Sequence, residues 1–129
     1  AIALCLSSNA DAYLLDEPSA FLDIEQRLHI SRTLKHFVEE KECTAFVVDH
    51  DLAFLDSIAE RLIVFQGEGG KHGTASAPLS LREGMNLFLK EQDVTYRRDP
   101  QTHRPRANKK DSVKDREQKE AGEYYYLNA

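Results

Sequence analysis

Two adjacent carboxylates, Asp16 and Glu17, come directly after the short apolar run at residues 12–15. Acidic side chains held together at the end of a buried strand repel each other, which is costly unless a cation or a reaction uses them. Asp16 could hold a magnesium ion through its waters, and Glu17 could act as the general base that orients an attacking water. A solvated acidic turn closed by Pro18 explains the two acids alone equally well.

A histidine, His50, follows the next apolar run, residues 45–48. In a parallel sheet the carboxyl ends of neighbouring strands meet at one edge, so His50 can lie beside Glu17 despite the helix between them. An imidazole there could hydrogen-bond a terminal phosphate or the attacking water. A lone histidine after a strand is more often incidental, but two acids at the matching strand end favour the functional interpretation.

The elements that must position these side chains follow from the apolar pattern. Residues 12–15 have the pattern of a strand buried on both faces, and residues 45–48 and 62–65 predict two further strands. Asp23 and Gln26 resemble a capping box that begins a helix, and residues 55–62 predict a shorter second helix. The alternation predicts an α/β fold with a mainly parallel sheet and flanking helices.

The second half of the chain predicts smaller elements. Glycines within residues 67–73 predict a hairpin turn, and a phosphate-binding loop is rejected because Lys71 is followed by His72 rather than Ser or Thr. Residues 80–92 predict a helix, 94–96 a short strand, 112–120 a helix and 123–127 a strand. Residues 97–110 are rich in Arg and Lys and predict an extended cationic segment without a core of its own.

Composition bounds the class of protein. The 129 residues carry a net charge of -5 with charges of mixed sign, which argues against a free-standing nucleic-acid binder. Cys5 and Cys43 form no C-x-x-C pair, so we expect two buried thiols and no metal cluster within this chain. The apolar runs are too short to span a bilayer, and we predict a cytoplasmic protein. Residues 1–6 open in mid-helix without a cap, which predicts a fragment of a longer protein.

Three motifs in this order resemble a known family. Leu-Leu-Asp-Glu-Pro at residues 14–18, Ser-Ala-Phe-Leu-Asp at 19–23 and Asp-His-Asp at 49–51 resemble the Walker B, D-loop and H-loop motifs of ABC-type ATPases. The resemblance implies ATP and Mg²⁺ as cofactors, with Asp16 serving the metal through water and Glu17 and His50 catalytic. It also implies that Ser19 and Asp23 reach the nucleotide in a facing domain. The phosphate-binding, glutamine and signature loops are absent, so we expect the fragment alone to be inactive.

Later motifs narrow the resemblance to class E ABC proteins, the RNase L inhibitor family. They lie at residues 63–67, 84–89, 95–100, 104–106 and 124–126. The resemblance implies an ATP-hydrolysing ribosome-recycling factor that splits subunits and binds the small subunit and its rRNA in termination and initiation. It implies a release-factor-like partner, a first ATPase domain in the same full-length chain, and iron–sulfur clusters only in an N-terminal part absent here. Residues 1–92 would then belong to the second ATPase domain, and residues 93–129 would form a basic hinge-like segment.

The basic segment and the function each leave alternatives. Arg97, Arg98, Arg104 and Arg106 could contact rRNA phosphates or dock as a hinge against the first ATPase domain, and we favour the hinge over RNA and over a solvated loop. The ATPase subunit of a membrane transporter is an alternative function, against which the arginine-rich tail argues. A non-catalytic ribosome-binding module, with purely structural Asp16 and Glu17, is another.

Overall fold

The computed structural model describes residues 1–102 and 104–125. The chain divides into two compact units, Ala1–Ile58 and Ala59–Ala129, and each is considered by itself. Among the described residues no helix is both long and apolar enough to cross a membrane. Cys5 and Cys43 are free and only partly buried, rather than fully buried as predicted.

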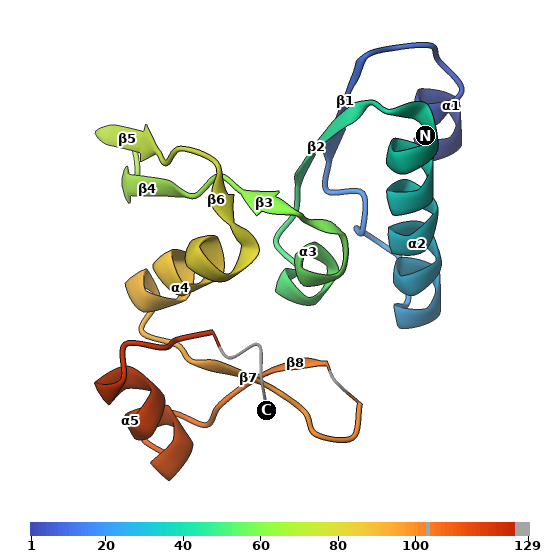
Figure 1. Cartoon of the computed structure of the whole chain (residues 1–129). Helices are drawn as coiled ribbons and strands as arrows, with labels where there is room; N and C mark the ends of the chain where they lie inside the picture. Colours follow the sequence, from blue (N-terminus) through green and yellow to red (C-terminus); the bar gives the residue numbers. More distant parts are fainter. Residues whose placement is uncertain (103, 126–129) are drawn as a thin grey trace. The chain divides into compact units, whose positions relative to one another are not determined.

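The first unit is built around one β-α-β crossover (Figure 1). Strands β1 and β2 pair in parallel, in a register that runs from Ala12 opposite Thr44 to Asp16 opposite Val48. The elements, in chain order, are α1 (Ile2–Leu6), β1 (Ala12–Asp16), α2 (Ile24–Lys41), β2 (Thr44–Val48) and α3 (Leu52–Ile58). These strands and the long helix confirm the predicted order of the first half of the chain.

Alternation along the strands explains the packing of this unit. Leu15 is buried with Leu34 of α2 and Phe54 of α3, and this cluster forms the core. The prediction that β1 is buried on both faces is wrong within the described chain, because Leu14 is 77% exposed and its cross-strand neighbour Phe46 is 51% exposed. Only the face that carries Leu15 is covered by the helices.

An aspartate immediately precedes and caps each of the two helices that follow the strands, α2 and α3. Asp23 caps α2, because its Oδ1 accepts a hydrogen bond of 2.8 Å from the backbone N–H of Gln26, as the sequence predicts. Asp51 does the same for α3, since its Oδ1 accepts from the N–H groups of Ala53 and Phe54 at 2.9 and 3.1 Å. This cap explains why the helix predicted at 55–62 begins earlier, at Leu52–Ile58.

In the described part of the second unit there are three antiparallel strand pairs. Its elements are β3 (Arg61–Leu62), β4 (Phe65–Glu68), β5 (His72–Ala75), β6 (Leu79–Ser80), α4 (Leu81–Glu91), β7 (Tyr96–Arg98), β8 (Pro105–Ala107) and α5 (Val113–Glu120). β3 pairs with β6, β4 with β5, and β7 with β8. The prediction of a mainly parallel sheet therefore holds only for β1 and β2, and the fold is α/β with small two-stranded sheets.

The strand predicted at residues 62–65 is divided in two. Val64 is buried, and its N–H donates to Ser76 Oγ at 3.0 Å while its carbonyl accepts from the Ser76 N–H at 2.9 Å. The chain therefore changes partner strand at this residue, from β6 to β5. The predicted glycine hairpin is confirmed, and Gly67 has a φ of +142° with a virtual Cβ only 2.3 Å from the His72 carbonyl oxygen.

The cationic segment is more ordered than its composition predicts. Residues within it form β7 and β8, and the strand predicted at 94–96 lies at Tyr96–Arg98. Of the strand predicted at 123–127, Tyr125 forms a bridge with Tyr96, and residues 126–127 lie outside the described part. The helix predicted at 112–120 is confirmed as α5.

A buried polar network joins α5 to β7. Thr95 is fully buried and donates its hydroxyl to Asp115 Oδ1 at 2.5 Å, while the N–H of Asp111 donates to Asp115 Oδ2 at 3.0 Å. Lys119 forms an ion pair with the same carboxylate at 3.3 Å. The hydrogen bond from Thr95 has the largest effect on the pKa of Asp115. Together with the other donors it lowers this pKa, although burial acts in the opposite direction.

Replacing Asp115 with Ala should loosen α5, because the buried Thr95 hydroxyl, the Asp111 N–H and the Lys119 ammonium would lose their acceptor. Such a loss costs about 1–3 kcal/mol, or about 5- to 150-fold in the population of the open helix. Trypsin cleavage after Lys114 and Arg116, within α5, measures that population. Glu120→Ala is the matched control, since Glu120 is exposed on the same helix. Equal cleavage of both variants would show that the network does not hold α5.

The lowered pKa of Asp115 predicts a pH dependence of the same helix. A carboxyl whose pKa is lower in the folded state than in the unfolded state stabilises the fold above its ordinary pKa. That stabilisation is lost as the pH falls through the folded-state pKa. Hydrogen exchange of the α5 amides, corrected for intrinsic rates, should therefore show less protection in acid. The Asp115→Ala variant should lack this component, and an identical acid profile in both proteins would contradict the prediction.

Candidate active site

The candidate site lies where β1 and β2 end. The backbone N–H of Glu17 donates to the carbonyl of Val48 at 2.7 Å, which extends the parallel ladder one residue beyond Asp16. Glu17 then adopts a left-handed backbone conformation, with a φ of +46°. This conformation is uncommon for a non-glycine residue and marks a sharp turn out of the sheet.

The structure brings Glu17 and His50 together, as the sequence predicts. His50 Nδ1 lies 3.5 Å from Glu17 Oε1, and the two side chains are 74% and 54% exposed respectively. The pair is therefore within ion-pair distance and open to solvent. An accessible acid beside an imidazole can exchange a proton with water and can approach a phosphate oxygen.

Asp16 offers an exposed carboxylate that could hold a magnesium ion. It is exposed at the end of β1, directly before Glu17. No group of three or more His, Cys, Asp or Glu residues that could form a metal site occurs within residues 1–102 and 104–125. Mg²⁺ is commonly held by one or two carboxylates together with waters and substrate phosphates, so a single hard oxygen ligand fits this ion.

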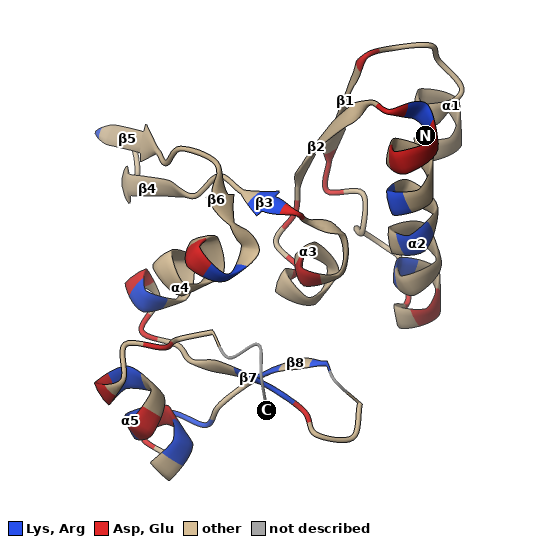
Figure 2. Ribbon diagram, viewed as in Figure 1, with Lys and Arg blue, Asp and Glu red and all other residues tan. Residues whose placement is uncertain are grey.

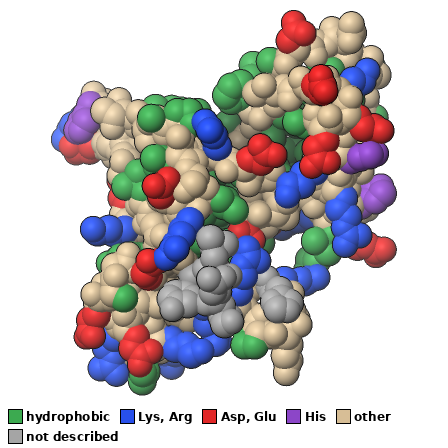
Figure 3. Space-filling model, in the orientation of Figure 1, with side chains coloured by type: hydrophobic (Ala, Val, Ile, Leu, Met, Phe, Trp, Pro, Cys, Tyr) green, Lys and Arg blue, Asp and Glu red, His purple; other side chains and the backbone are tan. Residues whose placement is uncertain are grey.

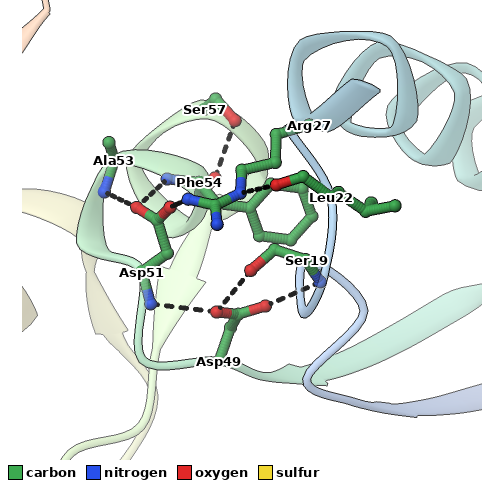
Figure 4. A network of polar contacts seen from close by, with 8 residues as sticks. All are labelled: Ser19, Leu22, Arg27, Asp49, Asp51, Ala53, Phe54 and Ser57. Atoms are coloured by element: carbon green, nitrogen blue, oxygen red, sulfur yellow. Dashed lines mark hydrogen bonds and ion pairs between the residues drawn. The ribbon is translucent and has the colours of Figure 1, made fainter. Parts of the chain in front are cut away.

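A carboxylate next to His50 joins the two loops that leave the strands (Figure 4). Asp49 Oδ1 accepts from the Ser19 hydroxyl at 2.8 Å and from the Asp51 N–H at 2.9 Å. Asp49 Oδ2 accepts from the Ser19 N–H at 3.1 Å. Ser19 is 1% exposed, so its hydroxyl faces the protein interior rather than solvent. We call these hydrogen bonds among Ser19, Asp49 and Asp51 the Asp49 clamp.

Two further residues attach the clamp to the helices. Arg27 of α2 forms an ion pair with Asp51 through Nη1, and its Nε donates to the Leu22 carbonyl at 3.0 Å. Asp51 also caps α3, as described above. Arg27 therefore connects the loop after β1 with the start of α3, as Figure 4 shows.

The clamp lowers the pKa of Asp49. Partial burial is the largest single influence and alone would raise the pKa of Asp49. Hydrogen bonds from the Asp51 and Ser19 backbones and from the Ser19 hydroxyl, together with the neighbouring His50, outweigh burial and lower the pKa.

Two predicted nucleotide-contact residues are engaged within the chain. Ser19 donates to Asp49, and Asp23 caps α2 while remaining exposed. Between them Phe21 is fully exposed and has a φ of +62°. The Asp-His-Asp motif at residues 49–51 is visible in the sequence, but no role in the site was predicted for Asp49, Asp51 or Arg27. The only signal was the pair of aspartates that flank His50, and nothing local shows that one of them reaches a serine thirty residues away.

The four predicted basic residues lie on or beside the β7–β8 hairpin, and Figure 2 shows the positive charge along these strands. Arg97 and Arg106 are cross-strand partners, and Asp99 offsets their charge through a 3.3 Å ion pair with Arg106. Arg98 donates to the Tyr125 hydroxyl at 3.4 Å. Arg104 is exposed. On the face shown in Figure 3, basic and acidic side chains are intermingled.

Comparison with known proteins gives sequence relatives that match almost the whole chain. No family model matches. Over 98% of its length the chain is 60% identical to an uncharacterised ABC transporter ATP-binding protein of Methanocaldococcus jannaschii. Over the same share it is 50% identical to ABC transporter E family member 1 of Arabidopsis thaliana and 49% identical to translation initiation factor RLI1 of Saccharomyces cerevisiae. It covers 21% of each relative, so the chain spans about one fifth of their length.

Solved structures similar to this chain come from the same kind of protein as the sequence relatives. An RNase-L inhibitor matches with a TM-score of 0.91 and 59% identity, over 98% of this chain and 25% of the other. An archaeal ribosome recycling factor, aABCE1, in complex with a ribosomal stalk protein matches with a TM-score of 0.87 and 60% identity, over 94% and 23%. ABCE1 in a structure of ribosome-bound archaeal Pelota and ABCE1 matches with a TM-score of 0.93 and 59% identity, over 97% and 21%. The chain belongs to the class E family of ABC-type ATPases, the family of the RNase L inhibitor.

Proposed function

We propose that this chain is part of an ATP-binding and ATP-hydrolysing domain of a ribosome-recycling factor. The observation that carries the proposal is the 3.5 Å approach of Glu17 and His50 at adjoining strand ends, in a chain of the ABC family. Asp16 precedes this pair at the same edge. Three groups of suitable chemistry therefore converge where a parallel sheet binds its ligand.

Each residue has a distinct role in this proposal. Magnesium, when bound, supplies positive charge to the phosphates, and Asp16 would hold it through water. Glu17 accepts a proton from the attacking water and orients it. His50 faces Glu17 through Nδ1, which leaves Nε2 for an oxygen of the terminal phosphate. Ser19 and Asp23 belong to the loop that would reach the nucleotide of a facing domain.

The division of the chain follows the same proposal. Residues 1–92 would belong to the second ATPase domain, and residues 93–129 would form the hinge. Several contacts tie the described part of the hinge to α4: Arg82 pairs with Glu123 at 2.6 Å, and the Tyr125 N–H donates to Asn86 Oδ1 at 2.9 Å. A hinge so attached could transmit motion to α4 when it docks against the first ATPase domain.

The partners are inferred from what the relatives are. RLI1 is a translation initiation factor, and the archaeal relatives are a ribosome recycling factor and a ribosome-bound protein found with Pelota. We infer that the full-length protein is cytoplasmic, binds the small ribosomal subunit and its rRNA, and acts with a release-factor-like protein rather than at a membrane. Iron–sulfur clusters would lie in its N-terminal part.

Glu17→Gln in the full-length protein should preserve ATP binding but stop hydrolysis at this site and trap the closed state. A positioned base contributes about 10²–10⁴-fold in rate, so the single-turnover rate should decrease by a factor in that range. The measurement requires the matching substitution at the other nucleotide site that the family implies. Glu39→Gln, at an exposed position on α2, is the control. Unchanged hydrolysis in Glu17→Gln would refute the role of Glu17. A full-length wild-type protein that does not bind ATP in a magnesium-dependent way would favour a non-catalytic module.

Replacing Arg104 and Arg106 together with Gln in the full-length protein should shift ATP-dependent closure, because a hinge would lose part of its docking charge. Closure can be followed by the distance between labels on the two ATPase domains. Lys114 and Arg116, both exposed on α5, provide a control with the same loss of charge. Unchanged closure with weaker, salt-sensitive binding to the small subunit would contradict the hinge and favour RNA. No change in either would favour a solvated loop.

A further inference from the structure

We propose that Asp49 is a positioning residue for hydrolysis, which holds Glu17 and His50 in register through the Asp49 clamp. This inference rests on the proposed function of that pair. Among the described residues, Asp49 forms no hydrogen bond or ion pair with Glu17. Its carboxylate instead receives hydrogen bonds from Ser19, two residues after Glu17, and from Asp51, the residue after His50.

The Asp49 clamp is important for the site because side-chain packing does not hold Glu17 and His50 in place. Glu17 and His50 are 54% and 74% exposed, so neighbouring side chains restrict their rotamers little. Their backbones are restrained instead. The Glu17 N–H is bound to the Val48 carbonyl, and two residues later the chain is bound again through Ser19. Glu17 therefore lies between two fixed points.

His50 is restrained from both sides in the same way. It lies between Asp49, held by Ser19, and Asp51, held by Arg27 and by the first turn of α3. The Asp49 carboxylate thus restrains both Glu17 and His50. It fixes the segment after Glu17 and also Asp49 and Asp51, the residues immediately before and after His50. A displacement of about 1 Å at a reacting group can cost about 10²-fold in rate, so such restraint is relevant to catalysis.

The chemistry of the clamp requires a carboxylate. The two oxygens of Asp49 accept from three donors, and a carboxylate offers only acceptors. An asparagine has nearly the same shape but would turn an NH₂ group toward one of these donors. Asp49→Asn therefore removes at least one of the three bonds, sets two donors against each other and removes the negative charge, with little change in volume. Ser19→Ala is milder, because it removes the hydroxyl bond and keeps the bond from the Ser19 N–H.

The clamp also connects two parts of the proposed mechanism. The loop at residues 19–23 is expected to meet the facing domain, and its link to the segment at 49–51 passes through Ser19 and through the Arg27 bond to Leu22. A shift of this loop on closure would be passed to His50 and Glu17. The geometry assigns Asp49 to that transmission, as an acceptor rather than as a group that touches the nucleotide.

The test uses the full-length protein with the other nucleotide site inactivated. Asp49→Asn should lower the single-turnover hydrolysis rate about 10- to 100-fold, with the Kd for ATP within about threefold of the wild type. Ser19→Ala should lower the rate less. Asp11→Asn is the matched control, since Asp11 is exposed just before β1, at the opposite end of the strand pair. It should leave the rate unchanged.

A double-mutant cycle separates positioning from a general structural role. If Asp49 acts through the pair, Asp49→Asn should add little to the loss already caused by Glu17→Gln. A further full loss in that background, parallel weakening of ATP binding, or a wild-type rate in Asp49→Asn would each overturn the proposal. A wild-type rate in Glu17→Gln would instead remove the proposed function itself, so the two failures are distinguishable.

Discussion

The register of the β1–β2 pair is the constraint on which the site depends. Asp16 lies opposite Val48, and the next amide, that of Glu17, binds the Val48 carbonyl. A slip of one residue would turn Leu15 away from the core that it forms with the helices. The same register therefore both buries Leu15 and places the two catalytic candidates, Glu17 and His50, beside each other. Core packing selects the register, and the register brings Glu17 to His50.

A second requirement is that the turns leaving these strands stay fixed while their functional side chains remain open to solvent. Exposed side chains cannot be held by packing, so hydrogen bonds to neighbouring backbone groups take that role. The Asp49 clamp does this with a half-buried carboxylate and a buried serine. Arg27 extends it to both helices, through Leu22 on one side and Asp51 on the other. The result is an open site on a restrained backbone.

The sequence predicted what local patterns determine. The β-α-β order, the Asp23 cap and the glycine hairpin are local, and the approach of Glu17 to His50 follows from parallel pairing alone. Local patterns could not predict that Val64 changes partner strand, because this depends on Ser76 twelve residues later. The prediction of a mainly parallel sheet holds only for β1 and β2 for the same reason, since strand pairing in the second unit is set by such longer-range contacts. The clamp was missed because its bonds between Ser19 and Asp49 span thirty residues.

The most direct test is a structure of the full-length protein with Mg²⁺ and a non-hydrolysable ATP analogue. If Glu17 and His50 act as proposed, the analogue's terminal phosphate will lie beside the His50 ring, with the Glu17 carboxylate directed at the water opposite the leaving group. Asp49 will still accept hydrogen bonds from Ser19. A terminal phosphate bound away from this strand edge, or a His50 ring separated from the Glu17 carboxylate with the nucleotide in place, would contradict these roles.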